Sequence, residues 1–228
     1  MIGSVVMNKL SLMVIIASDT KEQMYTKLLN KYKVKFKAIT HGIGTASSSM
    51  LDYFGLNEVE RGVIMAIMPT IMSKYILRYM NQRLKIAEPG NGIAFTIPVS
   101  SSTKYMNETY QKVEMEDIDM EDANKHLIIT IANEGFAEII MNAAKKVGAT
   151  GGTTINGRGL ESEKVIKFLG ISIEPEKDVV LILSDNDKKN AIMNEIVNSC
   201  GLKTPGAGIC FSLPVDHVVG LKELENLK

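Results

Sequence analysis

The sequence predicts an α+β fold made of two similar halves, each holding a four-stranded antiparallel sheet with two helices on one face. Three observations lead to this prediction: a segment that recurs in the second half, strand and helix patterns that alternate in the same order in both halves, and glycine turns at matching places. The chain has 228 residues, of which 45% are hydrophobic. This length is enough for two domains of about a hundred residues, each with its own core.

The clearest repeat joins PGNGIAFTIPV, which begins at Pro89, to PGAGICFSLPV, which begins at Pro205. At the same offset, ERGVIMAIM from Glu60 faces EKDVVLILS from Glu176. Farther upstream the offset shortens by one residue, and LSLMVIIA near the start of the chain then faces KHLIITIA. Because every element keeps its order across one change in loop length, internal duplication explains the pattern.

Each copy has the same order of elements. A β-branched apolar run predicts the first strand, and residues at helical spacing predict the helix after it. A second strand ends at a G-x-G turn, and a short helix closed by glycine leads to the third strand. A second helix and a glycine turn precede the fourth strand. The first copy has these elements at 11–17, 21–31, 35–40, 48–54, 62–68, 71–83 and 93–99. The second copy has them at 126–132, 136–147, 152–155, 162–169, 178–183, 188–199 and 209–215.

The order βαββαβ is that of the ferredoxin-like fold, in which both helices cover one face of the sheet. The strands of the second copy are apolar on both faces, so we expect another copy to bury the second face. We predict domains at 8–103 and 125–228, joined by an acidic linker at 104–124 whose run EMEDIDMED is expected to be solvated. Asp185 or Asn186 is predicted to cap the last helix.

Composition argues against several classes of function. Basic and acidic residues balance at 26 each, which argues against nucleic acid as a partner. No apolar run reaches the roughly 18 residues of a membrane span, so membrane insertion is not expected. The two cysteines, Cys200 and Cys210, indicate a reducing compartment, and the protein is predicted to be cytoplasmic. The three histidines lack the spacing of metal ligands, so no metal site is predicted.

The segments GATGGTTINGRG at 148–159 and TPGAGICFSLPV at 204–215 resemble the PII nitrogen-regulatory signal-transduction proteins and their PII-like relatives. The resemblance covers both copies, without the linker, and is strongest in the second. It implies βαββαβ domains that typically form trimers, and a T-loop between the second and third strands that contacts partner enzymes or transporters. We therefore expect a tandem PII-like, non-enzymatic regulator of an unidentified partner protein. A trimer is the expected assembly, with a dimer or a compact monomer as alternatives.

The resemblance also implies an adenine nucleotide as effector. In PII proteins the nucleotide lies between subunits, and its phosphates are held by the T-loop base, the glycine loop before the fourth strand and basic residues after it. Successive backbone N–H groups in such a turn form an anion-binding nest. ATP, ADP, AMP and cyclic nucleotides are the candidate effectors, and no cofactor is certain. The candidate binding residues are Gly42, Gly44, Pro89, Gly90, Gly92, Gly157, Arg158, Gly159, Thr204, Gly206 and Gly208.

The sequence departs from the PII pattern at the phosphate site. The lysine that usually follows the second glycine is replaced by Ile93 and Ile209, and the paired arginines after the last strand are missing, which leaves Arg158 as the best cation. A charge-assisted hydrogen bond is worth roughly 1.5–3 kcal/mol, so losing two or three weakens triphosphate binding roughly a hundredfold to a millionfold. A mononucleotide or cyclic nucleotide is affected less. A purely structural role for the glycine turns is the alternative.

The loop between the second and third strands is short in both copies. In the second copy Val165, Ile166 and Leu169 stand at helical spacing, which favours a helix folded against its own domain over a partner-seeking tip. A small enzyme, or a metal-handling protein similar to CutA, shares this fold and is the alternative function. A thermal-shift screen with adenine nucleotides and divalent metals would separate these hypotheses.

Overall fold

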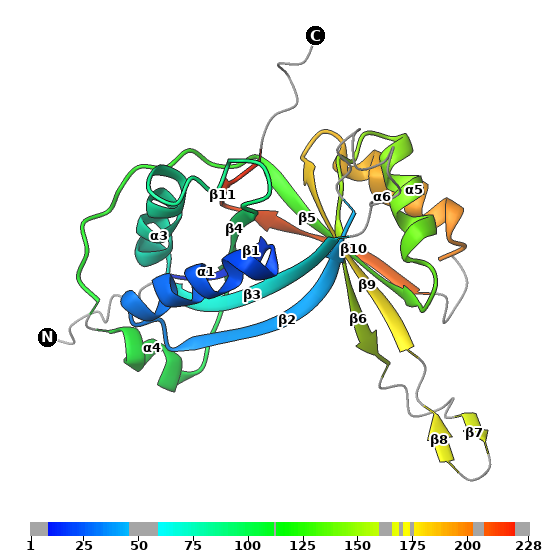
Figure 1. Ribbon diagram of the computed structural model, residues 1–228, viewed down its shortest axis with the longest axis horizontal. Coiled ribbons are helices and arrows are strands. Elements are labelled where there is room, and N and C mark those ends of the chain that lie inside the picture. Colours follow the sequence, from blue (N-terminus) through cyan, green and yellow to red (C-terminus); the bar gives the residue numbers. More distant parts are fainter. Residues whose placement is uncertain are drawn as a thin grey trace, which may run out of the picture. The chain divides into compact units, whose positions relative to one another are not determined.

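The computed structural model describes residues 9–45, 59–111, 113–159, 166–168, 171–173, 176–202 and 208–221. The chain forms two compact units, and Figure 1 shows its helices and strands. The first unit comprises Met1–Thr40, Gly62–Ala123 and Pro214–Lys228, and the second comprises His41–Arg61 and Asn124–Leu213. The domain limits expected from the sequence alone stay a prediction. No helix within the described ranges is long and apolar enough to cross a membrane.

The first half of the chain follows the predicted order of strands and long helices. Its strands coincide with β-branched apolar runs, and apolar residues at helical spacing give α1 and α3 one buried face each. The elements are β1 (Leu10–Ala17), α1 (Asp19–Lys31), β2 (Phe36–Gly44), β3 (Val59–Pro69), α3 (Thr70–Gln82), β4 (Ile93–Val99) and α4 (Lys104–Tyr110).

The second half repeats this order and adds three short strands. The elements are β5 (Lys125–Asn133), α5 (Ala137–Lys146), β6 (Thr153–Arg158), β7 (Ile166–Phe168), β8 (Ile171–Ile173), β9 (Glu176–Asp185), α6 (Lys189–Ser199), β10 (Gly208–Val215) and β11 (His217–Val219). The four predicted strands and two long helices of this half are therefore confirmed.

The short helix predicted at 162–169 is wrong for residues 166–168. These form β7, which pairs with β8 as an antiparallel hairpin, Ile166 opposite Ile173. Alternating apolar residues fit the period of a strand as well as that of one helical turn. In Figure 1 this hairpin lies beyond the ends of β6 and β9. The equivalent helix predicted at 48–54 lies outside the described residues.

The cap predicted for α6 is also wrong. The residue before the helix is Lys188, and its side chain makes no capping hydrogen bond. Asp185 is still the last residue of β9, and its carboxylate binds the side chain of Lys125 on the neighbouring strand β5 instead of capping the helix. Asn186 uses its backbone N–H to bind the carbonyl of Asn124, 3.2 Å away.

Nine of the described strands form one sheet, in the order β10-β5-β9-β6-β2-β3-β1-β4-β11. The predicted four-stranded sheets are therefore wrong, although each half keeps the βαββαβ order, β2-β3-β1-β4 and β10-β5-β9-β6. Two extensions explain the difference. β2 continues to Gly44, and its end pairs with β6 inside the second unit, Ile43 opposite Thr154. β11 adds to the outer edge of β4 inside the first unit.

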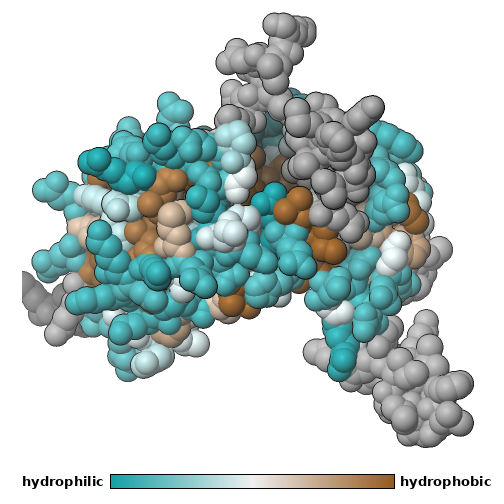
Figure 2. All heavy atoms as spheres, viewed as in Figure 1, coloured by the Kyte–Doolittle hydropathy of each residue, from teal (hydrophilic) through white to brown (hydrophobic). Residues whose placement is uncertain are grey.

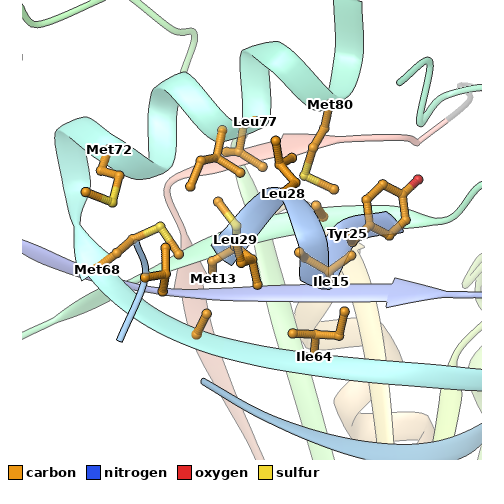
Figure 3. Packing of buried hydrophobic residues seen from close by; sticks show 14 of the residues in the cluster. Met13, Ile15, Tyr25, Leu28, Leu29, Ile64, Met68, Met72, Leu77 and Met80 are labelled. Carbon is orange, nitrogen blue, oxygen red and sulfur yellow. The ribbon is translucent and has the colours of Figure 1, made fainter. Parts of the chain in front are cut away.

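Each unit has its own apolar core. In the first unit, side chains from β1, β3, α1 and α3 point toward one another (Figure 3). The buried residues labelled there are Met13, Ile15, Tyr25, Leu28, Leu29, Ile64, Met68, Met72, Leu77 and Met80. In the second unit α5 and α6 pack on β5 and β9 through Ile128, Val180, Ile182, Ile140, Ile192 and Ile196. Burial of this kind contributes about 25 cal/mol per Å² of apolar surface and holds the helices on the sheet.

The predicted acidic linker is packed rather than wholly solvated. It begins with α4, whose Tyr110 is buried, and continues as residues 113–123, which we call the strap. Val113, Met115 and Met120 of the strap are half-buried against the core of the first unit, while its acidic side chains are exposed. Figure 2 shows hydrophilic residues over most of the visible surface, with smaller hydrophobic patches among them.

Candidate functional site

The glycine turns before β4 and β10 are built alike. Gly92 has a φ of +117° and Gly208 a φ of +147°, values that residues with a side chain rarely adopt. A Cβ atom on Gly92 would lie 2.4 Å from the carbonyl oxygen of Ile16, and one on Gly208 would lie 2.4 Å from that of Ile131. Ile16 and Ile131 are matching residues of the two copies. The sequence repeat is therefore matched in the structure by the same close backbone contact in both copies.

The turn before β4 is held by hydrogen bonds within the first unit. Tyr25 donates to the carbonyl oxygen of Asn91 at 2.9 Å, and the Asn91 amide donates to the carbonyl oxygen of Lys85 at 2.9 Å. Gly90 has a positive φ but no atom within 4 Å of an added Cβ. Pro89 is exposed at the start of the turn. These contacts give the turn a structural role, and phosphate binding there stays a prediction.

The predicted T-loop base Gly42 lines a groove of about 390 Å³ in the second unit. A Cβ atom on Gly42 would lie 2.4 Å from the carbonyl oxygen of Thr154, so glycine lets β2 approach β6 closely here. The groove is lined by His41, Gly42, Ile43, Glu60, Thr154 and Asn156. Copy-one and copy-two segments thus build one concave surface, because the end of β2 crosses to β6.

Thr154, one of the lining residues, has a buried side-chain hydroxyl. The residue is only 7% exposed, and its Oγ1 has no hydrogen-bond partner among the described residues. A buried polar group without a partner costs about 1–3 kcal/mol, so a ligand atom or water that reached Oγ1 would stabilise the folded protein. The Asn156 amide and the exposed Glu60 carboxylate supply further donors and acceptors. Among the described residues, the lining includes neither lysine nor arginine, which does not favour a triphosphate.

The other predicted binding residues are not part of this lining. Gly157 and Arg158 lie on β6, paired with Lys177 and Glu176 of β9, and Gly159 follows the strand. Gly44 ends β2, where an added Cβ would touch the Arg61 side chain at 2.9 Å. The turns that contain Pro89, Gly90 and Gly92 belong to the first unit. Thr204 and Gly206 lie outside the described residues.

A second groove, of about 1460 Å³, lies between the strap and α3 in the first unit. Lys74 binds Asp117 at 2.9 Å, and Arg78 donates to the carbonyl oxygen of Asp119 at 2.6 Å. The Lys74 ammonium lowers the pKa of the Asp117 carboxyl by hydrogen bonding, whereas burial raises the pKa of Asp216 at the groove wall. Sequence reasoning missed this groove because its walls come from five segments that lie far apart in the sequence.

Thr154 was also missed by the sequence prediction. Nothing in the pattern TTING distinguishes a threonine that lines a groove from one that lies wholly within the sheet. The distinction arises only when the end of β2 pairs with β6, and that pairing is a long-range contact. A hint existed in the glycine of HGIG, since glycine inside a strand often marks a close backbone approach.

Comparisons with known proteins place the chain beside PII proteins without assigning it to a family. No family model and no curated protein matches it. It is similar to Arabidopsis thaliana PII bound to citrate, with 22% identity over 42% of this chain and 80% of that chain and a TM-score of 0.34. The B. subtilis GlnK–ATP complex has 16% identity over 43% and 91%, with a TM-score of 0.31. A putative monooxygenase from Fusobacterium nucleatum has 14% identity over 92% and 94%, with a TM-score of 0.28. Likenesses this weak carry no conclusion about activity.

Proposed function

We propose that this protein is a non-enzymatic regulator of the PII type that binds a small effector in the groove at Gly42 and alters the activity of a partner protein. The hydroxyl of Thr154, which is buried and has no hydrogen-bond partner among the described residues, carries this proposal, because such a group is stabilised when a ligand atom bonds to it. The glycine and LPV motifs supply the link to signal transduction and nitrogen regulation.

The chemistry of the groove narrows the effector to a weakly charged adenine compound, AMP or a cyclic nucleotide, ahead of ADP and ATP. Thr154 and Asn156 offer hydrogen bonds to a base edge, and the Glu60 carboxylate can accept from ribose hydroxyls. A γ-phosphate would find neither lysine nor arginine among the described lining residues and would meet the negative charge of Glu60. The lysine and arginines that PII proteins use to hold phosphates are missing from the sequence, which also favours a less charged effector over ATP.

The hairpin of β7 and β8 supports a contact with a partner. It joins β6 to β9, the second and third strands of its copy, which is where PII proteins extend their T-loop. We propose that ligand binding at the base of β6 changes how this hairpin is presented, since β6 carries both Thr154 and the strand end that leads into it.

We also propose a homo-oligomer, with the trimer favoured, in the cytoplasm. The resemblance of both copies to PII proteins, which typically form trimers, supports this part of the proposal. Both cysteines are free thiols, as a reducing compartment requires. A solution mass of three chains is expected, and a monomer at high concentration would contradict this part of the proposal.

A thermal-shift titration with AMP, cyclic AMP, ADP and ATP tests the effector site. We expect AMP or cyclic AMP to raise the melting temperature of the wild type. Thr154→Val should abolish the shift and make the free protein slightly more stable, because it removes a buried hydroxyl that has no partner among the described residues. Thr153→Val, a buried neighbour outside the lining, is the matched control and should keep the shift.

The other possible results of this titration would contradict the proposal or favour a different function. A ligand shift that survives in Thr154→Val contradicts the assigned groove. The absence of stabilisation by every adenine compound contradicts the regulator of PII type. Turnover of a nucleotide would favour the alternative of a small enzyme, and stabilisation by a divalent metal alone would favour a CutA-like, metal-handling protein.

A further inference from the structure

We propose that the outer edge of β10 is a docking site for an extended strand of a partner protein, with the chemistry of two β-branched residues followed by glycine. The inference deepens the proposed regulatory function by naming a partner surface. It rests on a comparison of equivalent edges in the two copies, because β4 and β10 are matching strands with different neighbours.

The edge of β4 shows what such a strand looks like. β11 pairs with it antiparallel, Val218 opposite Phe95 and Val219 opposite Ala94. Gly220 follows the strand; its φ is +92°, and a Cβ atom there would lie 2.4 Å from the carbonyl oxygen of Gly92. The edge therefore accepts β-branched residues along its length, and glycine where the two backbones come closest.

The edge of β10 is built from the same parts. Phe211 takes the place of Phe95, and Gly208 takes the place of Gly92. Gly208 approaches the backbone of β5 just as Gly92 approaches that of β1. β10 is the terminal strand of the sheet among the described residues, so no described strand lies on its outer side. Ile209 and Phe211 are exposed, at 56% and 37%.

The chain's own equivalent of β11 has a different sequence. After β4, SSST at 100–103 stands where DHVV at 216–219 follows β10, and Lys104 stands in place of Gly220. Serine is a poor strand former, and Thr103 instead accepts a hydrogen bond from the Met106 N–H as the cap of α4. This segment is therefore committed to starting a helix and does not supply the missing strand.

Apart from Pro214 near its end, the edge lacks the features that keep natural edge strands single. Such strands usually carry a lysine or another inward charge, or are very short, so that they do not pair with other chains. The eight residues GICFSLPV contain no charge, and the proline lies near the end. A long apolar edge of this kind is typical of sheets that recognise a peptide by strand addition.

The test is a nuclear magnetic resonance titration of the isotope-labelled full chain with the capped peptide DHVVGL, which copies 216–221. We expect saturable shifts of the backbone amides of 208–213. The same peptide with N-methyl groups on both valines cannot form the ladder and should give none. Ile209→Lys should weaken binding about fivefold, because it places a charge on the edge. Ile139→Lys, an equally apolar and exposed site on α5, is the matched control and should leave binding unchanged.

The outcomes separate this inference from the effector site. AMP or cyclic AMP added to the same sample should shift the amide signals of Thr154 and Asn156. The effector site and the peptide site are therefore tested separately, because signals at one can shift while those at the other do not. Peptide shifts confined to β4 would mean that the peptide displaces β11, and that result overturns the inference. So would equal binding of the N-methylated peptide. Concentration-dependent shifts of β10 without peptide would assign the edge to a second copy of this chain instead.

Discussion

Gly92 and Gly208 explain, at the scale of single residues, why the same glycine turn occurs in both copies. Each lies where the last strand of its copy begins, and each lets that backbone pass a carbonyl oxygen of the first strand at a distance that no side chain tolerates. The same constraint at both places explains the repeat of glycine by steric contact alone. The same contact limits phosphate binding at these turns, because one side of each glycine faces a carbonyl oxygen, which is a hydrogen-bond acceptor and does not bind an anion.

Substituting Gly92 by alanine should lower the free energy of unfolding by about 2–4 kcal/mol, because the added Cβ combines a strained φ with the Ile16 contact. Gly90→Ala is the matched control: it has a positive φ but open space around it, and should cost about 1 kcal/mol. Urea denaturation of the two variants measures the difference. Equal losses would show that the close approach does not matter.

Tyr25 is a second residue with a measurable signature. Its side chain is buried on α1, and burial raises the pKa of its hydroxyl to about 12. Because the folded protein holds this proton more tightly than the unfolded chain, whose tyrosine pKa is about 10, the stability that the neutral hydroxyl provides is present below about pH 10 and is lost as pH rises toward 12. Tyr25→Phe should therefore make the fall in stability between pH 10 and 12 shallower. An unchanged slope would contradict this assignment.

At the scale of elements, Tyr110 fixes α4 and the start of the strap to the sheet. Its hydroxyl accepts a hydrogen bond from the Lys35 N–H at 3.0 Å and donates one to the carbonyl oxygen of Ile67 at 3.0 Å. The ring also meets Phe36 edge to face, with 5.8 Å between centroids. A residue of the predicted linker thus bridges the edges of β2 and β3.

Tyr110→Phe should destabilise the protein by about 1–3 kcal/mol, because it leaves the Lys35 N–H and the Ile67 carbonyl, both part of partly buried hydrogen bonds, without their hydroxyl partner. Tyr105→Phe on the same helix is the control; that side chain is 72% exposed, and we expect a change near zero. Thermal denaturation compares the two. A loss of similar size in both variants would argue against the bridge.

The sequence predicted elements better than their ends. Strands such as β1 and β9 are long β-branched runs, and α1 and α3 have a regular apolar face, so local physics determines them. The β7–β8 hairpin was mistaken for a helix because a few apolar residues fit both periods. The cap at Asp185 failed for another reason: Lys125 on the neighbouring strand competes for the same carboxylate, and that competitor is distant in sequence.

At the scale of the whole molecule, the repeat predicted the order of strands but not their final sheet. The order within each half follows from the βαββαβ connections, which are short. The pairing of β2 with β6, and of β11 with β4, depends on which strand edges remain open after each half has formed. The groove at Gly42 is a product of the first of these pairings, which is why its glycine could be named from the sequence while Thr154 could not.

The position of β11 has a consequence for how the chain folds as it is made. β4 is synthesised before the midpoint of the chain, yet the strand that borders it is encoded after Asp216. A nascent protein leaving the ribosome must therefore carry an incomplete first sheet, with an open edge, through most of translation. Shortened products that stop ahead of residue 217 should expose that edge and aggregate, so premature termination late in the message would be more damaging than the few missing residues suggest.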